Sequence, residues 1–219
     1  MNDKQLAAFR FQFITHCTDK YDYCQSAAMA LRGGCKWIQL RMKEKPIKEV
    51  KAVALQVQKL CKLYNAVFLL DDHVKLCKEI EADGVHLGKE DMHPSKAREI
   101  LGENYLIGST CNTFEDICEN TNHPIDYIGL GPFRFTSTKE NISPVLGIEK
   151  YELIVQECFT NNICIPLVAI GGITADDIVP ILQTGVNGIA LSSAILQAEN
   201  PVQETKKIVS LQKNYKKIV

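Results

Sequence analysis

Short apolar runs alternate along the chain with longer segments of helical periodicity. Each run is bounded by polar residues, Gly or Pro and is rich in β-branched or aromatic side chains, which is typical of buried strands. The segments between them, such as 47–64 and 174–185, place apolar residues on one face of a helix. The runs lie at residues 11–16, 36–41, 66–70, 83–87, 105–110, 126–131, 166–171 and 188–193. The pattern therefore predicts eight strands that alternate with helices.

Strands that alternate with helices through short links predict a parallel sheet. Two doubly wound halves would give the same order, but the chain has no early G-x-G-x-x-G turn, so a single (β/α)8 TIM barrel is favoured. We expect one domain over residues 1–219, with residues 1–10 as a short N-terminal extension. In this fold, polar residues at the carboxyl ends of the strands are the candidates for function.

Composition narrows the function classes. The chain is 46% hydrophobic and its 25 basic and 26 acidic residues leave a net charge of −1, so the electrostatic argument for a nucleic-acid or membrane-surface partner is absent. No apolar run has the length of a membrane span. The nine cysteines form no C-x-x-C pair and no secretion signal opens the sequence. We interpret them as reduced core residues of a cytoplasmic protein, with metal or redox use as the less favoured alternative.

The second predicted strand carries polar residues on one face only. Alternation puts Gln39, Arg41 and Lys43 on one face of the strand and apolar residues on the other. The apolar face suits packing against the outer helices. The polar face should then point into the barrel mouth, where an inward Arg and Lys favour a bound anion. The alternative is a solvated strand end whose charges pair with nearby acids.

Carboxylates follow the third and fourth strands. Asp71 and Asp72 come directly after residues 66–70, and Asp91 lies just past the fourth strand. Oxygen ligands of this kind suit Mg²⁺, especially when phosphate oxygens complete its coordination. Alone the signal is weak, because Asp is common in loops and at helix N-termini. The histidines nearby lack the spacing of a zinc site and are interpreted as structural: His73, His86 and His93.

Hydroxyl groups follow the fifth and sixth strands. Thr110 could bind a substrate, or equally cap a helix that starts near Thr113. The long connection after the sixth strand offers a composition suited to phosphate in Thr136, Ser137, Thr138 and Lys139. A solvated, flexible loop is the alternative there.

The seventh and eighth strands end in small residues. Gly171 and Gly172 follow one strand, and Ser192 and Ser193 follow the other, each before a predicted helix. Backbone N–H groups at such a turn form an anion site, and barrels that bind phosphate place it after these two strands. Together the two turns predict a phosphate site, although glycine pairs also occur simply as tight turns.

From residue 11 to residue 195 this order of elements resembles the thiamin phosphate synthase family. The motifs that carry the resemblance are QLRMK (39–43), ADGVHLGKEDM (82–92), YIGLGPFRFTSTK (127–139) and VAIGGI (168–173). The first and third are together highly specific. The resemblance implies two small phosphorylated substrates, a pyrimidine diphosphate and a thiazole phosphate, with Mg²⁺ as cofactor. The oligomeric state is left open, a homo-oligomer included.

The resemblance also implies roles for the residues at the strand ends. Gln39 would hydrogen-bond the aminopyrimidine, and Arg41 and Lys43 would hold the diphosphate. Asp72 and Asp91 would bind Mg²⁺. Thr110 would lie near the pyrimidine and the diphosphate. Contacts to the thiazole phosphate or the diphosphate would come from Thr136, Thr138 and Lys139, and the thiazole phosphate would further be bound by Gly172, Ser192 and Ser193.

The implied reaction is a dissociative substitution. The pyrimidine expels diphosphate to give a stabilised methylene cation, which the thiazole nitrogen captures. Such chemistry needs Mg²⁺ and cations where charge develops on the leaving group, and little from a general base. The implied catalytic residues are Arg41, Lys43, Thr110 and Lys139.

The sequence departs from the family pattern in two places. Asp71-Asp72-His73 stands where the family usually has Asn-Asp-Arg, and we expect Asp71 to bind substrate or to add a metal contact. Asn112 stands where the family often has His. The main alternative is a thiazole tautomerase of the same superfamily, which would need an acid–base residue at that position. A non-catalytic binder of phosphorylated ligands would have no reason to keep the Gln, Arg, Lys and Asp residues together.

Overall fold

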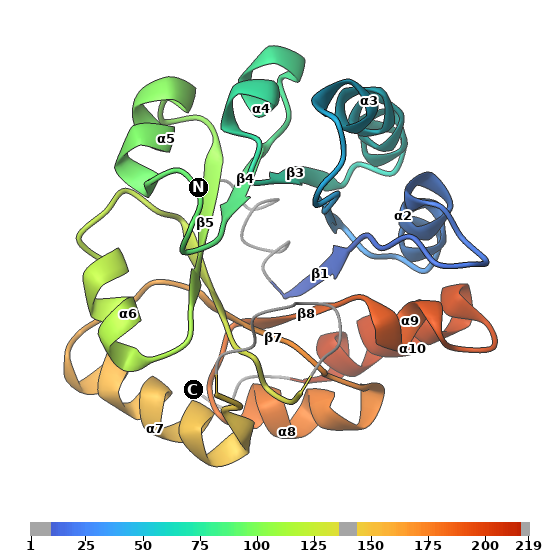
Figure 1. The fold of residues 1–219 in the computed structure, drawn as a ribbon. Helices are drawn as coiled ribbons and strands as arrows, with labels where there is room; N and C mark the ends of the chain where they lie inside the picture. Colours follow the sequence, from blue (N-terminus) through green and yellow to red (C-terminus); the bar gives the residue numbers. More distant parts are fainter. Residues whose placement is uncertain (1–9, 136–143, 216–219) are drawn as a thin grey trace.

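Eight parallel strands form a closed barrel in chain order, as Figure 1 shows. The computed structural model describes residues 10–135 and 144–215. The strands are β1 (Phe11–Ile14), β2 (Trp37–Leu40), β3 (Val67–Asp71), β4 (Gly84–Leu87), β5 (Leu106–Cys111), β6 (Tyr127–Leu130), β7 (Leu167–Ile170) and β8 (Gly188–Leu191). Each lies in one of the predicted runs or extends it by one residue. The barrel prediction is confirmed, and the doubly wound alternative is wrong because β8 pairs with β1.

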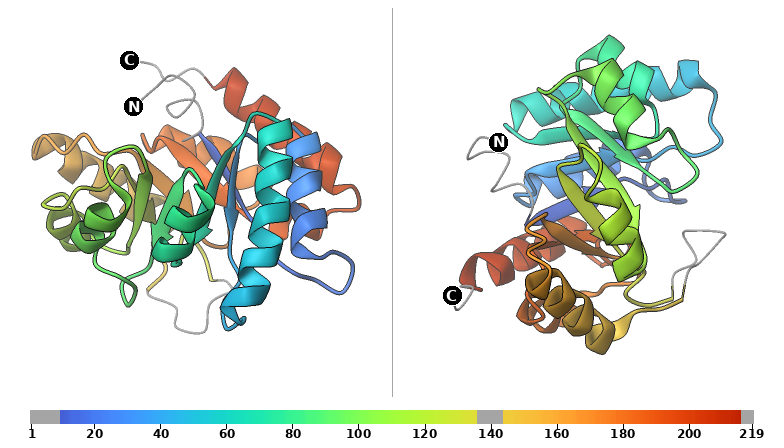
Figure 2. Two further views of the ribbon diagram at one scale, coloured as in Figure 1. Left: turned by 90° about the horizontal axis from the view of Figure 1, so that it is seen from above. Right: turned by 90° about the vertical axis from the view of Figure 1, so that its left-hand side faces the viewer.

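Helices surround the barrel on the outside (Figure 1). They are α2 (Tyr23–Arg32), α3 (Ile47–Leu63), α4 (Val74–Ile80), α5 (Pro94–Leu101), α6 (Phe114–Asn120), α7 (Gly147–Thr160), η1 (Ala175–Asp177), α8 (Ile178–Gln183), α9 (Ser193–Leu196) and α10 (Pro201–Asn214). The last of them, α10, packs against α2 and so closes the ring (Figure 2). Within the described residues, no helix combines the length and the hydropathy needed to cross a membrane.

The core has two layers because successive side chains of a strand point to opposite faces. Ile38, Leu40 and Met42 are buried between β2 and the helices. The barrel interior is filled by Ile14, Trp37, Val67, Leu69, Leu106, Tyr127, Val168 and Ala190. The predicted orientation of the second strand is therefore confirmed: its apolar face meets the helices, and its other face, with Trp37 and Gln39, lies inside.

The first and last described segments meet at the amino-terminal end of the barrel. The carbonyl of Arg10, just before β1, accepts a hydrogen bond from Gln212 Nε2 at 2.6 Å and one from the Ile189 amide at 3.0 Å. Because Gln212 belongs to the last turn of α10, this contact ties the end of the last helix to the start of the first strand.

The same end of the barrel holds a buried guanidinium. Arg98 of α5 donates to the carbonyls of Tyr105 (2.6 Å), Gly102 (3.0 Å) and Pro124 (3.0 Å) and to Asp126 Oδ2 (2.7 Å). Only 9% of Arg98 is exposed. One side chain thus satisfies several turn carbonyls at once, as a planar fork of donors can.

Replacing Arg98 with leucine is expected to lower the free energy of unfolding by about 3 kcal/mol, because Asp126 and the turn carbonyls lose their donor in a buried setting. Urea unfolding followed by circular dichroism measures this. Lys96 of the same helix pairs with Glu99 on the surface, so Lys96→Leu is the matched control and should leave the midpoint unchanged. Equal midpoints for the two variants would contradict the prediction.

Candidate active site

At the carboxyl end of β2 and β3, a buried amide and a carboxylate meet. Gln39 Nε2 donates to Asp71 Oδ1 at 2.5 Å, and the other oxygen of Asp71 lies 3.7 Å from Arg41 Nε. Asp71 is the last residue of β3 and is 7% exposed. The carboxylate thus accepts from the residue expected to contact the pyrimidine and neutralises part of the charge of the cation expected to hold the diphosphate.

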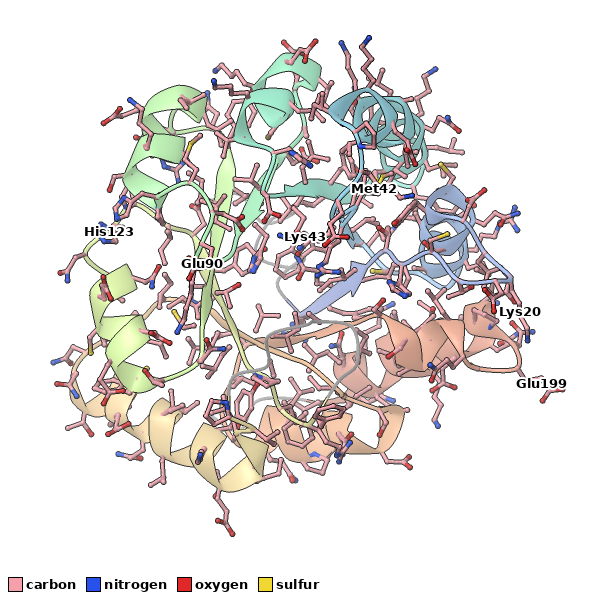
Figure 3. The ribbon with its side chains drawn as sticks, in the orientation of Figure 1. Lys20, Met42, Lys43, Glu90, His123 and Glu199 are labelled. Atoms are coloured by element: carbon pink, nitrogen blue, oxygen red, sulfur yellow. The ribbon has the colours of Figure 1, made fainter. Side chains whose placement is uncertain are left out.

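Lys43 lies among three carboxylates. Its ammonium donates to Asp72 Oδ2 and lies 3.4 Å from Asp71 Oδ2 and 3.9 Å from Asp91 Oδ2. Partial burial favours the neutral amine, but the three carboxylates outweigh it and raise the pKa of Lys43. Figure 3 shows Lys43 near the centre of the ring of strands, whereas Met42 lies toward the outer helices. The structure therefore brings Lys43 and all three predicted aspartates together.

Asp72 and Asp91 share a hydrogen bond. Burial, that bond and the charge of Asp71 raise the pKa of Asp72 to about 8. Burial works against ionisation of Asp91, but its bonds to Asp72 and to the Gly88 amide (2.7 Å) and the charge of Lys43 together lower its pKa. The backbone of Asp72 has φ +62°, a left-handed conformation that is rare outside glycine and is often found at functional sites. The two carboxylates thus lie close enough to oppose each other's ionisation, and a divalent cation bound between them would relieve that repulsion.

This donor set fits one kind of metal better than others. Its donors are carboxylate oxygens, whereas structural zinc sites are built mainly from Cys and His. Two oxygen donors beside cations suit Mg²⁺, which proteins commonly bind through one or two carboxylates plus substrate phosphate and water. The residues present therefore fit Mg²⁺ bound together with a phosphorylated substrate.

Thr110, on β5, extends the inward face of the barrel toward the mouth. Its Oγ1 lies 3.0 Å from His86 Nε2. Thr113 caps α6 by accepting from the Asp116 amide, so the alternative that Thr110 caps this helix is wrong. The side-chain amide of Asn112 donates through Nδ2 to the carbonyl of Gly131. Asn112 is thus engaged with the backbone at the position where a tautomerase would need an acid–base group.

The turns after β7 and β8 differ in their chemistry. Gly172 has φ +68°, and a Cβ there would lie 2.9 Å from the Arg134 carbonyl, so glycine is required by the adjacent loop. The buried hydroxyl of Ser192 has no hydrogen-bond partner within the described residues, and Ser193 begins α9. A buried unpaired hydroxyl at a barrel mouth is suited to bind a ligand.

The connection between β6 and α7 starts against the β7 turn, and its end returns to its start. The amides of Phe133 and Arg134 donate to the carbonyls of Ile170 and Gly171, and the Leu146 amide donates to Pro132. Arg134 also donates to both oxygens of Asp177 at 2.8 Å, an interaction that the sequence did not suggest. The predicted residues Thr136, Thr138 and Lys139 lie outside the described residues.

Of the three histidines interpreted as structural, two are explained by their contacts. His93 caps α5 by accepting from the Ser95 amide, which confirms the interpretation. His86 is 7% exposed and both of its ring nitrogens lie within hydrogen-bond distance of a hydroxyl, of Tyr127 and of Thr110, which agrees with a structural interpretation. The sequence did not indicate that it would lie beside the predicted site residue Thr110. The sequence signal for the inward orientation of His86 is its alternation with Val85 and Leu87, which point outward.

A cavity of about 180 Å³ opens elsewhere, near the amino-terminal ends of β3 and β4. It is lined by Gln58, Cys61, Lys62, Asn65, Ala66, Phe68, Glu81 and Asp83. Its polar groups are used by the fold: Asp83 accepts from the Phe68 amide, and Gln58 donates to the carbonyls of Ile80 and Glu81. The candidate active site is therefore the opposite end of the barrel, where the titratable groups converge.

The chain is similar to proteins of known activity. A family model described as thiamine monophosphate synthase matches residues 11–195. The thiamine-phosphate synthase of Bacteroides thetaiotaomicron is 60% identical over 202 residues, which cover 92% of this chain and 97% of that protein. That of Flavobacterium psychrophilum is 46% identical over 194 residues, or 89% and 94% of the two chains. Among solved structures, the thiamine phosphate pyrophosphorylase of Pyrococcus furiosus superposes with a TM-score of 0.83 at 33% identity, covering 95% of this chain and 98% of that one.

Proposed function

Because this chain belongs to the thiamine monophosphate synthase family, we propose how the residues at its barrel mouth divide the work of that reaction. The function of the chain is that of a thiamine-phosphate synthase, a transferase. In the proposed reaction the bond between the methylene carbon of the pyrimidine and its diphosphate breaks. The nitrogen of a thiazole phosphate then forms a bond to that methylene carbon. The observation that carries the assignment is the convergence of Lys43 with three aspartates at one edge of the mouth.

The edge formed by β2, β3 and β4 binds the diphosphate. Arg41 and Lys43 supply positive charge where negative charge grows as the bond to the pyrimidine breaks. Asp72 and Asp91 would hold Mg²⁺, which would supply further neutralisation of the leaving group. On substrate binding, Lys43 exchanges part of its contact with the aspartates for contact with phosphate oxygens. The carboxylates thus keep the lysine oriented until the diphosphate arrives.

The pyrimidine lies deeper, against Gln39 and Thr110. Gln39 Nε2 is bonded to Asp71, while its Oε1 is buried and has no hydrogen-bond partner within the described residues. An unpaired amide oxygen is suited to accept a hydrogen bond from the exocyclic amine of an aminopyrimidine. The role of Asp71 is then to fix which end of the Gln39 amide faces the substrate.

The thiazole phosphate binds across the barrel, at the turns after β7 and β8. Ser192 Oγ and the backbone at Gly172 and Ser193 supply donors for a phosphate whose charge does not change in the reaction. Thr136, Thr138 and Lys139 complete this side of the proposal as sequence-based assignments. Asn112, with its amide bonded to Gly131, gives no support to a tautomerase.

The direct test mixes the purified protein with the pyrimidine diphosphate, the thiazole phosphate and Mg²⁺ and measures thiamin phosphate and diphosphate by chromatography. Formation of the two products in equal amounts is expected. Conversion of a thiazole tautomer without release of diphosphate would overturn the proposal.

Asp71 provides a separate prediction. Asp71→Asn should weaken apparent Mg²⁺ affinity by roughly fivefold, because even a well-screened unit charge at close range contributes about 1 kcal/mol. The KM for the thiazole phosphate should stay the same, since that site lies across the barrel. Activity measured against Mg²⁺ concentration gives both values, and an unchanged metal dependence would show that Asp71 serves only the neighbouring Gln39 and Arg41.

We also propose a cytoplasmic setting for the protein. All nine cysteines lie in the described residues and none of them forms a disulfide there; five are buried in the apolar core, which suits a reducing compartment. Its expected partners are the two small phosphorylated substrates.

A further inference from the structure

Four polar side chains from four strands form a continuous hydrogen-bonded series inside the barrel. Gln12 Nε2 on β1 donates to the Tyr127 hydroxyl on β6 at 3.2 Å. That hydroxyl lies 2.9 Å from His86 Nδ1 on β4, and His86 Nε2 lies 3.0 Å from Thr110 Oγ1 on β5. The series runs from the depth of the barrel to a residue at its mouth.

Two glycines leave room for the rings of this series. A Cβ on Gly108 would lie 2.2 Å from the Tyr127 ring, and a Cβ on Gly129 would lie 2.9 Å from the His86 ring. Gly108 is paired across the sheet with both His86 and Tyr127. The strands are therefore built around the two rings, whose centroids are 5.5 Å apart.

The side chains of this series are buried, so their hydrogen-bond partners indicate which atoms carry the protons. Gln12, Tyr127 and His86 are 2%, 0% and 7% exposed. Burial also raises the pKa of Tyr127, so the phenol keeps its proton. Because the hydroxyl accepts from Gln12, its single proton is available for His86 Nδ1. A neutral imidazole that accepts at Nδ1 carries its proton on Nε2, from which it donates to Thr110 Oγ1.

We propose that Gln12 and Tyr127 fix His86 in its Nε2–H tautomer and that His86 thereby makes the Thr110 hydroxyl a hydrogen-bond donor toward the substrate. In the other tautomer, Nε2 would accept, and Thr110 would spend its proton on His86. A donor at this rim would stabilise the negative charge that grows on a leaving diphosphate, or would hydrogen-bond an acceptor nitrogen of the pyrimidine. The inference rests on the proposed function for the identity of the ligand. Gln12, Tyr127 and His86 are positioning residues.

The tautomer can be observed directly in the full-length protein. Two-bond ¹H–¹⁵N correlation spectra of ¹⁵N-histidine-labelled protein distinguish a protonated Nε2 from a protonated Nδ1, and the His86 signals are identified by their loss in His86→Leu. The wild-type protein should show the Nε2–H form, and Tyr127→Phe should shift His86 toward a mixture. Tyr151→Phe is the matched control, because Tyr151 is equally buried but donates to the Leu130 carbonyl in the outer layer. Its spectrum should keep the wild-type His86 tautomer.

Kinetics provide the second arm. Tyr127→Phe should lower kcat/KM for the pyrimidine diphosphate roughly tenfold, the scale of one hydrogen bond, and leave the KM for the thiazole phosphate unchanged. The same substitution made in the His86→Leu background should cost little more, because Tyr127 acts through His86. Urea unfolding checks that each variant is folded before assay, and the Tyr127→Phe spectrum decides the matter even if His86→Leu fails to fold.

Three results would overturn the inference. One is a proton on Nδ1 of His86 in the wild-type protein, and another is a tautomer that Tyr127→Phe leaves unchanged. The third is full activity of Tyr127→Phe together with a shifted tautomer, which would deny His86 any influence on Thr110. A wild-type protein that makes no thiamin phosphate would instead contradict the proposed function. The spectra are independent of turnover, so the two failures are distinguishable.

Discussion

Replacement of Lys43 by alanine should lower kcat roughly 10²–10³-fold, the usual cost of removing one donor aimed at charge that develops in the transition state. Lys43 is held at the mouth by contacts with Asp71, Asp72 and Asp91, so its ammonium is oriented before substrate binds. The charge on the leaving diphosphate grows only as the bond breaks. The loss should therefore appear in kcat more than in KM for the pyrimidine diphosphate.

Steady-state kinetics with saturating thiazole phosphate measure this effect. Lys45, two residues further on, pairs with Glu49 on the surface at 3.9 Å, so Lys45→Ala is the matched control and should keep wild-type kcat. Urea unfolding is needed for Lys43→Ala, because three carboxylates lose a common partner. A variant that is stably folded and raises KM at unchanged kcat would show that Lys43 contributes only uniform binding.

Removal of divalent metal should abolish turnover, and Asp91→Ala should lower it at least about 100-fold, because loss of a ligand should cost no less than loss of a residue that only supports one. Asp72 and Asp91 lie side by side where a cation would neutralise both, so loss of either carboxylate leaves a poorer set of donors. Activity should return when Mg²⁺ is added in excess over the chelator.

The measurement is turnover against free Mg²⁺ concentration for the wild-type protein and two variants. Asp19 is an exposed aspartate in the turn between β1 and α2, at the same end of the barrel, and Asp19→Ala should keep the wild-type metal dependence. Full activity in excess chelator would remove Asp72 and Asp91 from the metal site.

The strands and their faces could be predicted from the sequence because that information is local. The alternation of β2 separates Ile38 and Leu40 from Gln39, and a bounded apolar run identifies a strand without knowledge of its neighbours. Motifs at strand ends then name the rim residues, since all strands of a parallel barrel end at the same rim.

The contacts between rim residues could not be predicted in this way, because they depend on the register between strands. The sequence alone does not place Gln39 against Asp71. That contact follows from the pairing of β2 with β3. Gly108 looks like an ordinary strand glycine until its pairing with His86 and Tyr127 is known. The position of His86 beside Thr110 could not be predicted for the same reason: the spacing of His86 excluded a zinc motif, but its partners lie on β5 and β6.

The contact between Gln212 and the Arg10 carbonyl has a practical consequence for handling the protein. It holds both described ends of the chain at the face of the barrel that lies away from the reaction chemistry. A solid support, a fluorescent label or a fused carrier attached near either end would therefore project from the back of the molecule. Immobilised in this orientation, the protein would present its reactive face to the bulk solution, where both substrates can enter freely.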